Sequence, residues 1–111
     1  MVHNLYIVFL PTKNILKRTL LLSLTGARGG IVRLKILVML NRKTYNINEI
    51  SKNLSLDYKT IQHHIRVLEK SSLITSSRKR YANSYRLSSL LEANKDMLKE
   101  IWEKIDKGKN R

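Results

Sequence analysis

The side chains best suited to chemistry in this chain gather in residues 57–70, DYKTIQHHIRVLEK. Helical spacing would turn six of them outward: Tyr58, Lys59, Thr60, Gln62, His63 and Arg66. Gln62 can offer a paired donor and acceptor to adenine, and Arg66 or Lys59 can donate to guanine or to phosphate. His63 can donate to a base edge or a phosphate, and hydroxyls in the first helical turn commonly hold phosphate. As a set they favour a helix that reads the DNA major groove, whereas for any one of them a solvated surface is as good an interpretation.

The adjacent pair His63-His64 also raises the question of a metal site. Neighbouring helical residues point about 100° apart, so both rings can hardly bind one ion. The third histidine, His3, lies in an unrelated segment, and there is no cysteine. Since zinc takes three or four ligands, we expect no metal, and His64 is expected to be a packed, hydrogen-bonded core residue.

No pattern of residues in the chain indicates catalysis. There is no nucleophile motif, no glycine-rich phosphate loop after a strand and no plausible pair of carboxylates in the basic part of the chain. We therefore expect neither an enzyme nor a cofactor.

The charge of the chain is strongly positive, with 22 basic and 8 acidic residues and a net charge of +14. Residues 89–111 hold six basic and five acidic residues, so the excess falls on residues 1–88. Such a field favours a polyanionic partner, and nucleic acid is the natural one because lysine and arginine displace condensed counterions from phosphates. The alternatives are a merely basic protein or one that touches an anionic membrane.

Two apolar runs, Leu5–Leu10 and Leu20–Leu24, bear on location. Pro11 and three basic residues separate them, and neither approaches the ~20 residues that a membrane-spanning helix needs. The apolar run precedes the charges, which is the wrong order for a signal peptide. With no cysteine for disulfides, we expect a cytoplasmic protein with no membrane partner.

The first part of the chain is expected to pack the helix that carries these side chains. Residues 1–10 favour a strand, Thr12 can cap a helix that runs to about Leu24, and residues 26–30 interrupt it. Ile31 to about Arg42 predicts the central helix, because residues 36–40 are all apolar.

A helix-turn-helix follows. Thr44 to Ile47 is predicted as an extended link, and Asn48 as the cap of a helix that runs through Asn53. Asp57 is predicted to cap the outward-reading helix at its positive end. The inner face of that helix is the stripe Ile61, His64, Ile65 and Leu68.

A hairpin completes the motif. Residues 73–79 and 84–87 favour two short strands, joined by a basic tip. Arg78, Lys79 and Arg80 are predicted to contact phosphate or to enter a minor groove.

The last segment predicts one helix, from about Leu90 to Asp106, behind a capping box at Ser89 and Glu92. Leu91, Asn94, Leu98, Ile101 and Ile105 are spaced as the core positions of about two heptads. So short a seam must pack against a second copy or against its own chain, and we favour the second copy. The expected dimer contacts are Leu16, Leu20, Leu24, Leu91, Asn94, Leu98, Ile101 and Ile105.

These elements in this order predict a mostly α (α+β) fold, a winged helix-turn-helix with an N-terminal helix and a long C-terminal dimerisation helix. An unrelated small α+β core is the alternative. We divide the chain into an N-terminal arm and helix (1–30), a winged helix-turn-helix core (31–88) and a C-terminal helix with a basic end (89–111).

Three segments resemble ArsR-like winged-helix transcriptional regulators, especially the archaeal branch: RGGIVRLKILVML (28–40), NINEISKNLSLDYKTIQHHIRVLE (46–69) and RYANSYRLS (80–88). The string DYKTxxHHxxxLE is the most specific part, and the resemblance covers about residues 26–106. It implies a homodimer built from N- and C-terminal helices that binds palindromic operator DNA. It also places Tyr58, Lys59, Thr60, Gln62, His63 and Arg66 on the recognition helix and Arg78–Tyr81, including Lys79 and Arg80, on the wing. Metal-sensing members use cysteines, or histidines on the last helix, and this chain has neither; residues 2–10 have no counterpart.

The expected function is therefore a homodimeric, sequence-specific regulator that binds double-stranded DNA. Residues 57–70 would lie in the major groove, with a wing at 78–83 on the backbone or in the minor groove. Two other classes stay open: an architectural or RNA-associated protein without sequence preference, and an interaction module of a transcription assembly.

Overall fold

The computed structural model describes residues 13–24, 29–78 and 83–109. Its helices are α2 (Lys13–Leu24), α3 (Gly30–Arg42), α4 (Ile47–Leu54), α5 (Tyr58–Lys70), α6 (Ser89–Glu92) and α7 (Lys95–Lys109), and its strands are β1 (Tyr45–Asn46), β2 (Ile74–Arg78) and β3 (Asn83–Leu87). The predicted first strand, the Thr12 cap and the tip of the hairpin lie outside the described residues.

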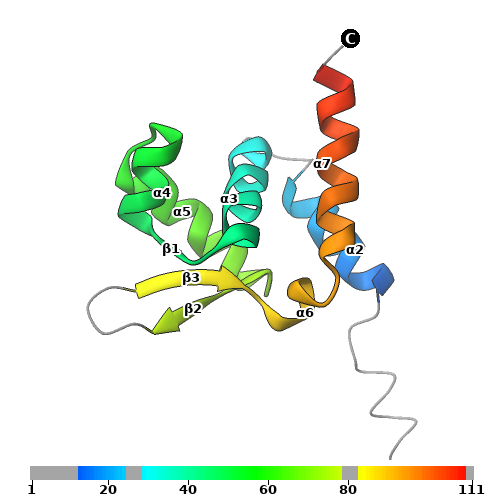
Figure 1. The fold of residues 1–111 in the computed structure, drawn as a ribbon, viewed down its shortest axis with the longest axis horizontal. Helices are drawn as coiled ribbons and strands as arrows, with labels where there is room; N and C mark the ends of the chain where they lie inside the picture. Colours follow the sequence, from blue (N-terminus) through cyan, green and yellow to red (C-terminus); the bar gives the residue numbers. More distant parts are fainter. Residues whose placement is uncertain (1–12, 25–28, 79–82, 110–111) are drawn as a thin grey trace, which may run out of the picture.

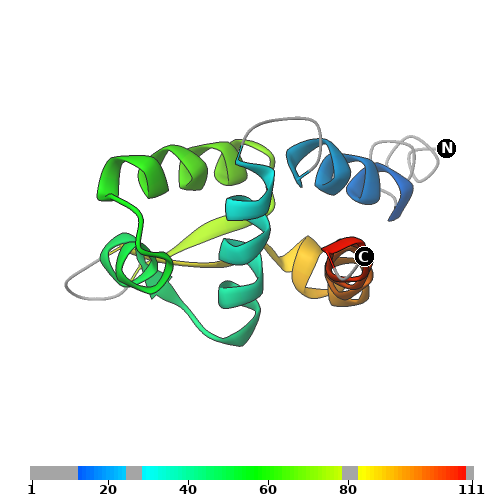
Figure 2. The same ribbon diagram turned by 90° about the horizontal axis from the view of Figure 1, so that it is seen from above.

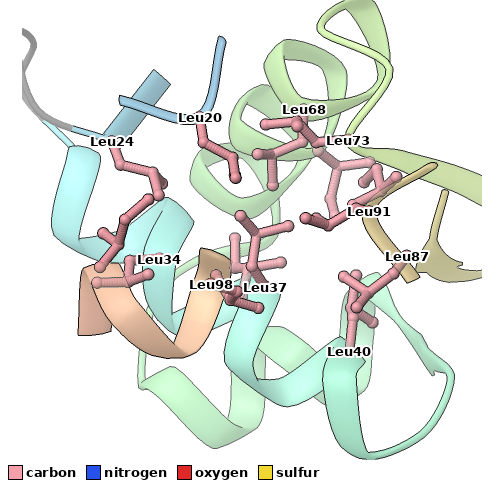
Figure 3. Close-up of a cluster of buried hydrophobic side chains, with 14 of the residues drawn as sticks. Leu20, Leu24, Leu34, Leu37, Leu40, Leu68, Leu73, Leu87, Leu91 and Leu98 are labelled. Atoms are coloured by element: carbon pink, nitrogen blue, oxygen red, sulfur yellow. The ribbon is translucent and has the colours of Figure 1, made fainter. Parts of the chain in front are cut away.

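The core gathers around α3, as its run of apolar residues predicts. Leu34, Ile36 and Leu37 are fully buried, and Leu20 of α2, Leu68 of α5 and Leu91 of α6 are buried in the same cluster. Figure 3 shows leucines of α2, α3, α5, β3 and α7 converging on this centre. Full burial of such a side chain stabilises the fold by about 1.5–3 kcal/mol, so this cluster holds the helices in place.

The strands form one antiparallel sheet in the order β1-β3-β2. Tyr45 of β1 pairs with Tyr85 of β3, and Ile74 of β2 pairs with Leu87 of β3. The predicted hairpin is β2 and β3, and the short link before α4 adds β1 to it as a third strand. Helices α3, α4 and α5 lie on one side of the sheet, and the hairpin extends away from α7 (Figures 1 and 2). This is the winged helix-turn-helix fold that the order of elements predicts.

The start of α4 differs from the prediction. Asn46, not Asn48, is the N-cap: its side chain accepts from the Glu49 amide at 2.8 Å, and the Glu49 carboxylate accepts from the Asn46 amide at 2.9 Å. This reciprocal capping box satisfies two amides at once, whereas a cap at Asn48 would shorten the helix by two residues. The prediction missed it because Asn46 also ends strand β1.

The prediction of a single C-terminal helix is also wrong. The chain forms a short α6, interrupts it at Ala93 and Asn94, and then begins α7 at Lys95. The N-cap is Ser88, whose hydroxyl accepts from the Leu91 amide at 3.2 Å, rather than Ser89. Asn94 bonds the carbonyl oxygen of Leu90 through Nδ2 at 2.8 Å, so its amide closes the end of α6.

The heptad seam finds its neighbours inside the same chain. Leu16, Leu20 and Leu24 of α2 and Leu91, Leu98 and Ile101 of α6 and α7 all belong to the buried core, and Ile105 and Asn94 are partly buried. Six of the eight expected dimer contacts therefore have almost no surface to offer. Their spacing specifies an apolar stripe, which α3 covers as well as a second copy would.

Within the part of the chain that the structure describes, no helix is both long and apolar enough to cross a membrane.

Candidate nucleic-acid interface

The turn between α4 and α5 positions the outward-reading helix. Ser55 ends α4 in the left-handed region at φ 55°, the Leu56 amide donates to the carbonyl oxygen of Ser51 at 3.1 Å, and the Ser51 hydroxyl donates to the carbonyl oxygen of Leu56. These bonds hold the turn without a long loop, so α5 leaves α4 at a set angle.

Asp57 caps α5, as its position before the helix predicts. Its carboxylate accepts from the Thr60 amide at 3.2 Å and from the Thr60 hydroxyl at 2.5 Å. The side-chain hydrogen bond from Thr60, followed by the backbone bond from the same residue, lowers the pKa of Asp57. The Thr60 hydroxyl has only one proton, so Thr60 serves the cap, and a phosphate contact through it would have to break this bond.

The inner face of α5 is the predicted one. Ile61, His64, Ile65 and Leu68 are all buried. Arg33 of α3 reaches the His64 ring, with 3.1 Å between a terminal guanidinium nitrogen and Nδ1. Burial first, then the Arg33 charge and His63, lower the pKa of His64, so the ring is neutral at neutral pH. His64 is the hydrogen-bonded core residue that its place on the inner stripe predicts.

The outer face of α5 borders a cleft of about 370 Å³ between this helix and the sheet. Tyr58, Gln62 and Arg66 line its helical wall, one turn apart, and Asn83 and Tyr85 line its sheet side. Lys59 and His63 are exposed on α5 but do not line it. The structure thus brings three of the six predicted reading residues together and leaves Lys59 and His63 on a neighbouring surface.

Five polar residues of this cleft were not predicted to line it: Asn46, Asn48, Glu69, Asn83 and Tyr85. Burial, and then the nearby Glu69 and Tyr58, raise the pKa of Tyr85, while the charge of Arg66 opposes them. The period of two along β3 places Asn83 and Tyr85 on one face, and the helical period adds Glu69 to the line of Gln62 and Arg66. The sequence thus contains the periodicity of each element, but only the packing of α5 over β3 brings these residues into one cleft.

The wing is described only in its strands. Arg78 pairs with Asn83 at the end of the hairpin, and the side chains of Arg78, Lys79, Arg80 and Tyr81 lie outside the described residues.

The positive charge is distributed unevenly along the fold. Residues 1–46 hold eight basic and no acidic residues, and residues 71–88 hold four basic and no acidic residues. Residues 47–70, which form α4 and α5, hold four basic and three acidic residues. The helix pair is close to balanced, so the basic field comes from its surroundings.

The described residues contain no group of three or more histidine, cysteine, aspartate or glutamate side chains that could hold a metal ion. The rings of His63 and His64 lie 5.4 Å apart and tilted by 59°, one exposed and one buried.

Solved structures share this fold. Reduced HlyU from Vibrio cholerae is similar at 26% identity with a TM-score of 0.60, over 81% of this chain and 93% of that one. The homodimeric winged helix-turn-helix DNA-binding domain of Mb0332 from Mycobacterium bovis, a possible ArsR-family regulator, aligns at 18% identity with a TM-score of 0.64, over 82% and 79% of the two chains. The transcriptional repressor BigR from Xylella fastidiosa aligns at 20% identity with a TM-score of 0.63, over 78% and 79%. At these last two identities the likeness shows the fold alone.

A comparison with curated protein sequences gave no match. The model of one family, the N-terminal domain of the methanogenesis regulatory protein FilR1, matches residues 18–106, which run from within α2 through most of α7. The neighbours and the matching family are transcription regulators and not enzymes. The chain therefore belongs to the family of FilR1 N-terminal domains, within the winged-helix transcription regulators.

Proposed function

We propose that this protein is a sequence-specific regulator of transcription that binds double-stranded DNA as a homodimer. The observation that carries the proposal is the cleft between α5 and β3, where Tyr58, Gln62 and Arg66 stand on the helix opposite the wing. A duplex seated here would receive α5 in its major groove and the hairpin on the neighbouring backbone or minor groove.

The charge distribution supports base reading rather than purely electrostatic binding. Residues 47–70 are nearly balanced, so α5 adds little to the general attraction for phosphate. Its amide and guanidinium groups are suited to hydrogen bonds with base edges, whereas the basic hairpin and the N-terminal part would supply affinity.

Selection of duplexes from a random pool with the purified protein tests sequence specificity. Two-fold symmetry would place two α5 helices about 34 Å apart, so the selected sites should be palindromic with half-sites one helical turn apart. No preference beyond tenfold over random duplex would support an architectural protein instead, and no binding to any duplex at low salt would support an interaction module.

Substitutions assign roles within the site. Arg66→Ala and Gln62→Ala should alter sequence preference, each at a cost of about 1–3 kcal/mol if it removes a base contact. Lys79→Ala should weaken all sequences alike, because a phosphate contact carries no sequence information. Lys99→Ala, an exposed change on α7, is the matched control. Unchanged affinity and preference for the first three variants would refute the assigned surface.

The homodimer needs a surface other than the buried seam. Ile15 and Leu22 lie seven residues apart on α2 and are 55% and 68% exposed, and Trp102 of α7 is 36% exposed. Lys17 and Glu100 form an ion pair at 3.9 Å, so α2 and α7 lie side by side. We propose that these exposed apolar side chains, with their buried neighbours behind them, meet a second copy.

The finer assignments are part of the same proposal. The segments 28–40, 46–69 and 80–88 support membership of the archaeal branch of ArsR-like regulators. The division at residues 30 and 88 would separate the parts that dimerise from the part that reads DNA.

A further inference from the structure

A second cleft, of about 300 Å³, is lined by residues at the end of α3, at the end of β3 and at the start of α6 and α7. Figure 1 shows how these elements are arranged. No residue lines both clefts. Asn83 and Tyr85 of β3 border the first cleft, while Arg86 and Leu87, at the other end of the strand, border the second.

Basic side chains from three separate elements meet at this cleft. Arg42 and Lys43 come from the end of α3, Arg86 from β3 and Lys95 from the start of α7. Glu92 is the one acidic residue of the lining. The cleft therefore carries three more positive than negative charges, and the tertiary fold assembles this excess from segments that are far apart in sequence.

Two of these four cationic side chains have a partner in the fold, and two form no ion pair among the described residues. Glu92 pairs with Lys95 at 2.6 Å, and the Lys43 ammonium lies 5.1 Å from the centre of the Tyr45 ring. Within residues 13–24, 29–78 and 83–109, neither Arg42 nor Arg86 forms an ion pair. Two guanidinium groups, each with several donors in a planar fork, are thus left to face an anion.

Concavity and size point to a small ligand. The volume is at the lower end of the range of small-molecule sites, about 300–1,000 Å³. Leu40 and Leu87 add apolar surface between the cations. A hollow lined by one sign of charge focuses its field and raises the local concentration of an ion of the opposite sign.

We propose that this cleft binds a small anion that carries two or more negative charges on phosphate or carboxylate oxygens. Arg42 and Arg86 would each hold two oxygens, and Lys95 would exchange Glu92 for the anion. The bound anion would link α3 and β3 of the helix-turn-helix to the start of α7. This site is independent of the DNA contacts proposed for α5.

Calorimetric titration of the full chain with pyrophosphate, and separately with citrate, tests the site at constant ionic strength. The double variant Arg42→Ala/Arg86→Ala should bind either probe about tenfold more weakly or worse, because each loses charge-assisted hydrogen bonds. Glu92→Gln should bind severalfold more tightly, since it removes the competing carboxylate. Lys35→Ala/Lys99→Ala removes two exposed charges outside the cleft and should change the affinity less than about twofold.

The two probes separate the sources of the anion: tighter pyrophosphate binding indicates a phosphate ligand, and tighter citrate binding a carboxylate ligand. Equal weakening in both double variants would show diffuse attraction to a basic protein and would overturn the proposal. Amide NMR shifts should be confined to residues around 40–44, 86–89 and 92–95. Shifts centred on residues 58–66 would place the anion on the proposed DNA surface. If Arg42→Ala/Arg86→Ala lost as much affinity for random duplex as for the small anion, the cleft would be a contact for the DNA backbone. Either result would overturn the proposal.

Discussion

Arg33 and His64 form a buried polar pair between α3 and α5, with 3.1 Å from the guanidinium to Nδ1 of the ring. A guanidinium can only donate, so Nδ1 accepts and the neutral ring carries its proton on Nε2. Nε of Arg33 also donates to the carbonyl oxygen of Ser23 at 2.7 Å, which ties the end of α2 to the same point. One side chain thus joins α2, α3 and α5.

Acid should weaken this junction. The pKa of His64 is lowered in the folded chain from the ordinary 6.5, first by burial and then by Arg33. Below about pH 6.5 the unfolded chain binds a proton that the folded chain resists, so stability falls as the pH drops from there toward the folded pKa and is unaffected above it. The melting temperature should therefore be lower at pH 5 than at pH 7.5.

Two variants isolate the histidine. His64→Asn keeps an acceptor near the position of Nδ1 but cannot titrate, so its melting temperature should be lower overall yet less dependent on pH between 7.5 and 5. His63→Gln, which changes the exposed neighbour, should keep most of the pH dependence. If the melting temperature of His64→Asn depended on pH as strongly as that of the wild type, the acid sensitivity would belong to another group.

Gly29 is required by both its backbone and its neighbour. Its φ is +86°, and a Cβ there would lie 2.4 Å from Cε1 of His64. Gly29→Ala should destabilise the fold by about 2 kcal/mol or more, since a left-handed alanine costs about 1–2 kcal/mol before any clash. Urea unfolding measures this loss.

Ser55 provides the matched contrast, because it also has a positive φ, of 55°, but is not glycine. Ser55→Gly should be neutral or stabilise by up to about 1 kcal/mol, as relief of left-handed strain offsets the added chain entropy. If Gly29→Ala unfolded at the same urea concentration as the wild type, the close approach to His64 would be wrong.

Glu69 places a carboxylate among the residues that face DNA in the proposed function. Glu69→Gln should raise affinity for every duplex by about 1 kcal/mol or less, because a phosphate near an exposed carboxylate is repelled by about that amount in water. Fluorescence anisotropy with a selected and a random duplex measures both the general affinity and the sequence preference. Weaker binding with a lost preference for cytosine would mean instead that Glu69 accepts from a base edge.

The dimer surface can be tested on α2. Ile15→Ser/Leu22→Ser should shift the protein toward a particle of 13.0 kDa in light scattering, since each apolar side chain contributes about 1.5–3 kcal/mol when it becomes buried. Ile31→Ser on α3, which is 38% exposed, controls for loss of surface apolarity alone. A particle mass of 13.0 kDa for the wild-type protein at micromolar concentration would refute the proposed homodimer.

Local features of the sequence determined much of this protein. Periods of 3.6 and 2 predicted α2 to α5 and the hairpin, Asp57 marked the start of α5, and the stripe through Ile61 and Leu68 placed His64 inside. These signals act over a few residues, because caps and amphipathic faces depend on neighbours in the chain.

Only the tertiary structure decided which surfaces meet. The same heptad spacing suits a second copy or the chain's own α3, and the fold buries Leu98 and Ile101 within one chain. The packing of α5 over β3 joins Glu69 and Tyr85 to Gln62, and the meeting of α3, β3 and α7 gathers Arg42, Arg86 and Lys95. Sequence periodicity says which side of an element is apolar, but partners distant in the chain are set by how whole faces fill the core together.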